Sequence, residues 1–279
     1  MKKISFILLL SLIAVATFAQ KKSKKSKQEQ KTEVKSSASN DSSASNDKVL
    51  LRYNLKQGES YEQTMENDIK MQIMGMEIPM IQMIQRTSTK NVVTNVDASG
   101  NLTTESTIEK FYMKQSNPMM GDLEYDSEDP KKQSPELAQQ VSSMKGTKTT
   151  TKMSATGKVL DAPKEAGLSN SSNQYPEQAV GVGDTWEIST SIKNPMINKE
   201  ITSRNQYKLL ERANGKVIIE VNSKMTAEGK EVGTMSGKLT IDEKTGIVTE
   251  GNLIQNMNIE VQGMETKLDS TIKLTGKKL

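Results

Sequence analysis

Polar and apolar residues alternate along most of the chain from residue 48 onward, with the two-residue period of a β-strand that has one buried face. The clearest run is 59–74, in which Ile69, Met71 and Ile73 fall on one side. Similar runs follow at short intervals to the end of the chain, and β-branched residues dominate them. We therefore predict a succession of long strands.

Glycine-rich turns separate these runs, and the alternation slips by one position near Lys110, which predicts a β-bulge. Consecutive long strands with tight turns favour antiparallel meanders. Ser134 and Pro135 suit an N-cap and a first helical position, and they predict a short helix over 135–144. Aromatic residues make up 4% of the chain, so the core must be thin and built from Ile, Val, Leu and Met. The predicted fold class is all-β with one short helix, long antiparallel meander strands and curved or half-barrel sheets.

Two five-residue stretches, 58–62 and 183–187, share one pattern: a glycine, an acid, a hydroxyl residue, a large aromatic and a glutamate. A long strand pattern begins at each, and the order strand, reversal, strand, glycine turn, strand, hairpin occurs twice. We predict two related β units, 48–165 with the short helix and 179–279, in one sheet or in two domains. Trp186 is then expected to be a core residue.

The N-terminus predicts export. Residues 1–19 combine two lysines, an apolar core too short to span a bilayer and small residues before Gln20, as secretory signal peptides do. Residues 20–47 are rich in lysine and serine and cannot bury apolar surface, so we predict a disordered linker. Its lysines could also contact an anionic membrane surface weakly. Lipidation needs a cysteine where Gln20 stands, so no lipid anchor is expected.

The composition excludes several classes of function. The chain has no cysteine and no histidine, which rules out disulfides, thiol catalysis, Ser-His-Asp triads and zinc sites built on these ligands. We therefore expect no enzyme and no cofactor. The basic excess lies in residues 1–47 and the rest is near neutral, so we expect no nucleic-acid binding.

Methionine is unusually frequent, at 17 residues. Candidate ligand-binding positions are Met71, Met74, Met76, Met80 and Met83, which crowd two adjoining strands. Three interpretations stand: core filling in place of aromatics, an adaptable apolar groove, and a soft Cu(I) site.

An acidic run over 122–129 spaces its oxygen ligands as calcium loops do. It lacks the glycine and the closing glutamate of such loops, because Ser127 and Gln133 stand there. We predict a solvated loop and no metal site.

Four stretches carry a resemblance: Leu51 to Tyr61, Tyr125 to Ser127, Ser154 to Val159 and Val182 to Trp186. They resemble an uncharacterised exported β-rich family of Bacteroidota, a domain of unknown function with many lipoprotein-like members. The resemblance spans roughly residues 48–276. It implies a location and a fold but no catalytic residue.

From these observations we expect a non-enzymatic binding or carrier protein of the cell envelope, periplasmic or extracellular. Its partner would be an apolar ligand or an envelope protein. A structural or protein-interaction module of the envelope is one alternative, and a methionine-based Cu(I) protein is the other. The sequence leaves the ligand and the oligomeric state open.

Overall fold

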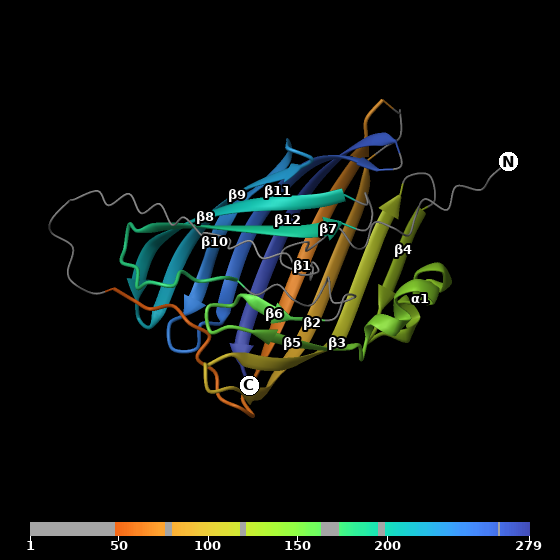
Figure 1. Ribbon diagram of the computed structural model, residues 1–279. Helices are drawn as coiled ribbons and strands as arrows, with labels where there is room; N and C mark the ends of the chain where they lie inside the picture. The colour runs from red at the N-terminus through yellow and green to blue at the C-terminus, as the bar shows by residue number, and fades with distance from the viewer. Residues whose placement is uncertain (1–47, 76–79, 118–120, 163–172, 195–198, 262) are drawn as a thin grey trace, which may run out of the picture.

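The computed structural model describes residues 48–75, 80–117, 121–162, 173–194, 199–261 and 263–279 (Figure 1). The predicted signal peptide (1–19) and linker (20–47) lie outside the described residues, and so does Met76. Within the described part, no helix is long and apolar enough to cross a membrane.

The structure confirms the predicted fold class: strands dominate and there is one short α-helix. The strands are β1 (Ser60–Ile73), β2 (Ile81–Val96), β3 (Leu102–Asn117), β4 (Gly121–Asp126), β5 (Lys148–Met153), β6 (Val159–Asp161), β7 (Thr185–Asn194), β8 (Lys199–Ala213), β9 (Lys216–Ala227), β10 (Lys230–Asp242), β11 (Val248–Val261) and β12 (Met264–Lys278). The helices are α1 (Pro135–Val141) and two short 3₁₀ turns, η2 (Pro130–Lys132) and η3 (Ser142–Met144).

All twelve strands belong to one antiparallel sheet, in the order β6-β5-β3-β2-β1-β12-β11-β10-β9-β8-β7, with β4 also paired to β3. The sheet curves strongly but does not close into a barrel (Figure 1). The last strand, β12, lies between β1 and β11 and joins the two halves of the chain by continuous antiparallel pairing. The halves therefore share one sheet.

One segment with strand-like alternation lies outside the sheet. Residues 49–55 alternate like a strand, but their only described β-bridge is Val49 with Val180. The Tyr53 N–H donates to the Ala155 carbonyl at 2.8 Å, and the Asn54 N–H donates to the Thr245 carbonyl at 3.0 Å. The alternation alone therefore does not place this segment in the sheet, because its backbone hydrogen bonds go to two turns instead of a neighbouring strand.

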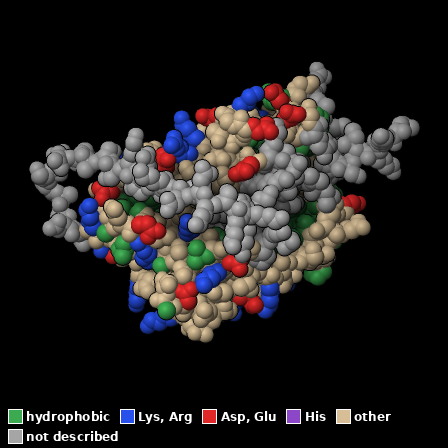
Figure 2. Space-filling model, viewed as in Figure 1, with side chains coloured by type: hydrophobic (Ala, Val, Ile, Leu, Met, Phe, Trp, Pro, Cys, Tyr) green, Lys and Arg blue, Asp and Glu red, His purple; other side chains and the backbone are tan. Residues whose placement is uncertain are grey.

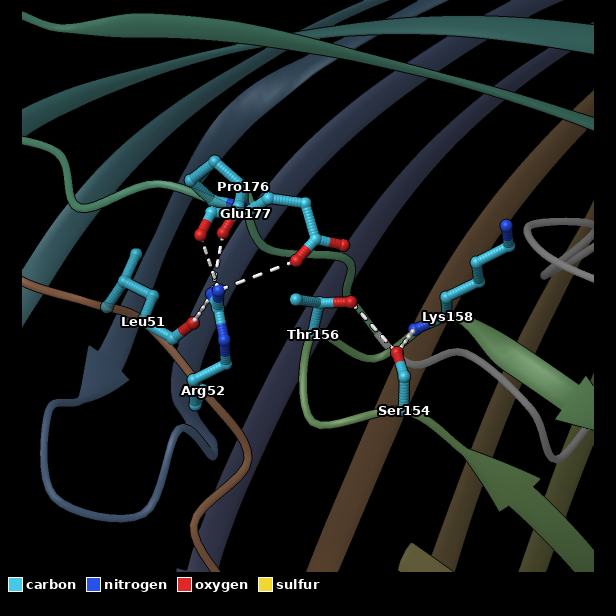
Figure 3. Close-up of polar contacts among 7 residues, drawn as sticks. All are labelled: Leu51, Arg52, Ser154, Thr156, Lys158, Pro176 and Glu177. Carbon is cyan, nitrogen blue, oxygen red and sulfur yellow. Dashed lines mark hydrogen bonds and ion pairs between the residues drawn. The ribbon is translucent and has the colours of Figure 1, made fainter. Parts of the chain in front are cut away.

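Segment 49–55 is held over one end of the sheet by Arg52. Its guanidinium donates to the carbonyls of Pro176 and Glu177, each at 2.6 Å, and pairs with the Glu177 carboxylate at 3.6 Å (Figure 3). Ser154 and Thr156 brace the adjacent turn through a 2.8 Å hydroxyl contact. The N-terminal segment and the connector before β7 thus form a cover at this end.

The predicted helix over 135–144 is present as α1 followed by η3. Leu137 and Val141 of α1 pack in the same apolar cluster as Phe111 and Tyr125. Ser134 occupies the N-cap position, but its hydroxyl accepts from the Glu124 N–H at 3.0 Å and makes no cap bond within the helix. The serine thus ties the helix to β4, the strand it contacts.

Candidate apolar binding face

One side of the sheet, which we call the inner face, carries the buried residues. On β1 it presents the odd-numbered side chains from Tyr61 to Ile73, and on β12 the even-numbered ones from Met264 to Gly276. No charged residue occupies these positions, or the inner positions of β2 from Ile81 to Val93 and of β11 from Gly251 to Val261. The charged residues of these four strands lie on the opposite, outer face, except Lys278 at the end of β12, which is paired in register with Tyr61 and forms an ion pair with Glu59. The inner face is therefore neutral in a chain in which 26% of residues are charged.

The inner face divides into two apolar clusters. The first lies under segment 49–55 and includes Leu209, Leu239 and Ile272. The second occupies the other end of the strands; its sheet members include Ile69, Met71, Met83, Phe111, Met113, Ile201, Met225, Met257, Ile259, Val261 and Leu268. Cover from the loops is therefore concentrated on the first cluster, while α1 reaches the second at its β4 edge.

Buried tyrosines keep the covered end neutral. Burial raises the pKa of Tyr61 to about 12, and it also raises the pKa of Tyr53, Tyr175 and Tyr207. These phenols are therefore protonated at neutral pH. The Tyr175 hydroxyl donates to the Gly246 carbonyl at 2.6 Å, so one of them also fixes a turn.

A row of polar side chains crosses the inner face between the two clusters. They are Gln85, Asn67, Ser270, Gln255, Ser223 and Asn205. The register pairs Gln85 with Asn67, Ser270 with Gln255 and Ser223 with Asn205, and Met235 of β10 lies between Gln255 and Ser223. We call these six residues the central polar row. Amides and hydroxyls here interrupt an apolar surface without adding charge.

Two residues of the central polar row have unmet hydrogen-bonding capacity. Asn67 and Gln85 face each other across β1 and β2 and are 0% and 2% exposed. The Asn67 side-chain carbonyl accepts from the Ser270 hydroxyl at 2.5 Å, but its Nδ2 has no partner among the described residues. Gln85 Oε1 has none either, and Gln85 Nε2 reaches only Thr87 Oγ1, at 3.4 Å. A free donor and a free acceptor thus belong to two directly paired residues.

The candidate methionines separate into two places. Met71 and Met83 are buried on the inner face, on adjoining strands of the second cluster. Met74 and Met80 are 49% and 53% exposed beyond the strand ends, and Met76 lies outside the described residues. The second cluster also contains Met113, Met225 and Met257, which come from distant strands.

Two of these thioethers converge on one amide. Gln255 Nε2 donates to the Met257 sulfur at 3.1 Å and lies 3.5 Å from the Met225 sulfur. Gly233 lies between them on β10 and leaves room for this approach, since a Cβ there would lie 2.8 Å from Met257 Cγ. The Cu(I) hypothesis stays a prediction, and here the two sulfurs surround a neutral donor.

The predicted solvated loop over 122–129 is wrong in its first part, because Gly121–Asp126 form β4. Its carboxylates serve local pairs: Asp122 with Lys114 at 3.3 Å and Glu128 with Lys145. Within the described ranges, no group of three or more acidic side chains could hold a metal ion. The acidic residues therefore alternate because they lie on the exposed face of β4 and in the turn that follows this strand.

Part of the chain matches a protein family whose function is not known. Residues 165–248 match a family described as a family of unknown function (DUF6263). No curated protein matches the chain.

Among the solved structures that match the chain, two are similar to it at low TM-scores. The first is described as lipid–protein interactions in lipovitellin; it has 9% identity and a TM-score of 0.47, over 80% of this chain and 25% of that one. This chain thus spans about a quarter of that protein. The second is DynF from the dynemicin biosynthesis pathway of Micromonospora chersina, with 6% identity and a TM-score of 0.24, over 85% of this chain and 92% of that one. At these TM-scores the likeness carries no conclusion about function.

Asn67 and Gln85 were not among the sequence candidates. Their signal is visible in hindsight, because each interrupts an apolar series on a strand face: Asn67 precedes Ile69 and Met71, and Gln85 follows Met83. A polar residue in a strand normally indicates an exposed position, so only the register reveals that this pair is buried.

Proposed function

We propose that this protein is an exported, non-enzymatic binding or carrier protein that holds an apolar ligand against the second cluster of its inner face. The observation that carries the proposal is the uncharged face itself, which crosses four long central strands. The apolar face of a sheet is normally covered by a second layer of helices or strands. Among the described elements, α1 is the one α-helix, and it packs only at the β4 edge of the second cluster.

The composition of the second cluster supports a ligand that varies in shape. Methionine side chains are unbranched and flexible, so they repack around different apolar surfaces at little cost. Met71, Met83 and Met257 are buried in this cluster, so a ligand among them would be enclosed. A carrier that shields its ligand from water needs such an enclosure.

The cellular setting of the proposal comes from the N-terminus. Residues 1–19 have the pattern of a signal peptide, and Gln20 stands where a lipidated cysteine would be. We therefore propose that the protein is exported to the periplasm or to the outside of the cell. On the described part of the face drawn in Figure 2, basic and acidic side chains are interspersed, which does not favour nucleic-acid binding.

Binding of the neutral dye Nile red tests the proposal. We expect a rise in dye fluorescence on binding, and native mass spectrometry of the purified protein should show a co-purified lipid. The double variant Met71→Ala/Met83→Ala should weaken dye binding about tenfold, because two contacting side chains are lost. The matched control Met74→Ala/Met80→Ala should not, since both residues are exposed. A wild-type protein that binds no dye and carries no lipid would contradict the proposal.

A further inference from the structure

The unmet pair Asn67 and Gln85 requires an explanation. Buried polar groups in folded proteins almost always have partners, and a buried group without one costs about 1–3 kcal/mol. Here a donor, Asn67 Nδ2, and an acceptor, Gln85 Oε1, both lack one among the described residues, on directly paired positions of two central strands. Two such costs at one place indicate a site that something else completes.

Other buried amides on the inner face show that the arrangement is specific. Asn205 and Asn91 also accept from a serine hydroxyl on the next strand, at 2.5 Å from Ser223 and 2.6 Å from Ser106. Their Nδ2 groups are used, because Asn205 donates to the Ile188 carbonyl at 3.2 Å and Asn91 to the Thr89 carbonyl at 3.4 Å. Asn67 has the same serine contact but leaves its donor free.

We infer that Asn67 and Gln85 bind the polar group of a neutral amphiphile whose chain lies on the second cluster. Asn67 Nδ2 donates to an oxygen of the ligand, and Gln85 Oε1 accepts from its O–H or N–H. A hydroxyl or an amide meets both requirements. This inference rests on the proposed function and specifies the chemistry of the ligand.

The electrostatics of the face argue against a charged headgroup. Along the second cluster, the inner positions of the four central strands carry no lysine or arginine that could neutralise a phosphate or carboxylate, and Lys278, at the other end of β12, is paired with Glu59. Placing a charge without a partner in such surroundings is far costlier than placing a neutral hydrogen-bonding group. The neighbours Ile69, Met71 and Met83 supply the apolar surroundings of the chain instead.

A ligand pair isolates the predicted bond to Gln85. Decanol has an oxygen for Asn67 and an O–H for Gln85, whereas decyl methyl ether retains the oxygen and lacks the O–H. Both are measured on the full chain by displacement of Nile red, together with decanamide as the second donor-bearing compound. We expect decanol and decanamide to bind about tenfold more tightly than the ether.

The variant Gln85→Met completes a double-mutant cycle, in which the hydroxyl of the ligand and the side chain of residue 85 are changed separately and together. Methionine has a similar length but cannot accept the ligand proton in the same way, so the variant should bind decanol and the ether equally. Its free energy of unfolding should not fall, because an unpaired buried acceptor has been removed. Gln85→Leu serves as a second replacement if Gln85→Met does not fold. Gln72→Met, on the exposed outer face of the adjoining strand, is the matched control and should keep the preference.

The outcomes separate the two proposals. If Nile red does not bind the wild-type protein, the proposed function itself fails. If the dye binds but decanol shows no advantage over the ether, the pair is satisfied by water or by internal rearrangement, and the inference is wrong. Retention of the preference in Gln85→Met would also overturn it.

Discussion

Trp186 is the single tryptophan of the chain, and its surroundings decide between a core role and a binding role. It is 8% exposed on β7 and stacks on Tyr207 of β8, with ring centroids 5.4 Å apart and planes 12° from parallel. Its Nε1 has no partner among the described residues. The ring thus belongs to the first cluster, as a core residue would.

We therefore predict that Trp186→Ala destabilises the protein by about 3–5 kcal/mol, because it removes a large buried ring. Trp186→Phe should cost less, because it keeps the contact with Tyr207 and removes the unpaired N–H. Urea unfolding followed by circular dichroism measures both. Ile254→Ala, at an exposed position of β11, is the control and should stay within about 0.5 kcal/mol of wild type. An unchanged midpoint for Trp186→Ala would contradict the core role and favour a binding role.

Individual side chains of the candidate site were only partly predictable from the sequence. Met71 and Met83 fall on the buried face because the two-residue period determines which side of a strand they occupy. Met74 and Met80 sit just beyond the strand ends, where the period no longer applies, and they are exposed. The Asn67–Gln85 pair depends on register and on unmet hydrogen bonds, which no local pattern encodes.

At the scale of elements, the two similar sequence stretches form the same local structure. The Gly58 N–H donates to the Val93 carbonyl and the Gly183 N–H to the Leu209 carbonyl, both at 2.8 Å. In each turn the carboxylate two strand positions before the aromatic, on Glu59 or Asp184, accepts from a backbone N–H three residues earlier, at 2.9 Å. The acid is thus required by the turn, which explains the shared pattern without any chemistry.

Elements that depend on distant contacts were harder to predict. A glycine weakens a strand, but β11 runs through Gly251 from Val248 to Val261. A Cβ at Gly251 would lie 2.8 Å from Leu239 and 3.1 Å from Leu274, so the glycine allows packing within a continuous strand. Segment 49–55 likewise has the right alternation, but its partners are two turns about 100 and 190 residues away.

Docking of segment 49–55 can be tested at one of these turns. Gly246 has a φ of +72°, and a Cβ there would lie 2.1 Å from the Arg52 carbonyl oxygen, which cannot move without displacing the segment. Gly215 has a similar φ of +71° but nothing within 4 Å. Both alanine variants therefore share the backbone cost, and Gly246→Ala should be less stable by about a further 1–3 kcal/mol. Equal free energies of unfolding for the two variants would show that the segment does not need this contact.

At the scale of the molecule, the position of β12 determines how the two halves of the chain are coupled. This strand pairs with β1 from Thr266 to Lys278 and with β11 from Met264 to Thr275. If β1 of the first half unfolds, β12 of the second half therefore loses its partner on that side, and the reverse also holds. The sequence predicted the two units but could not decide between one sheet and two domains, because strand alternation does not specify which strand pairs with the last one.

We predict that the protein unfolds in one cooperative transition. Trp186 lies on β7 at one end of the sheet, so its fluorescence reports that end, while far-UV circular dichroism reports the whole sheet. The urea midpoints from the two signals should coincide, because continuous hydrogen bonding through β12 couples both halves. Moving the fluorophore with Tyr112→Trp in a Trp186→Phe background places it on β3, in the other half, and its curve should match the circular dichroism curve of that variant. If the fluorescence midpoint of either protein differs from the circular dichroism midpoint of the same protein, the two halves unfold separately. The shared sheet then does not couple them.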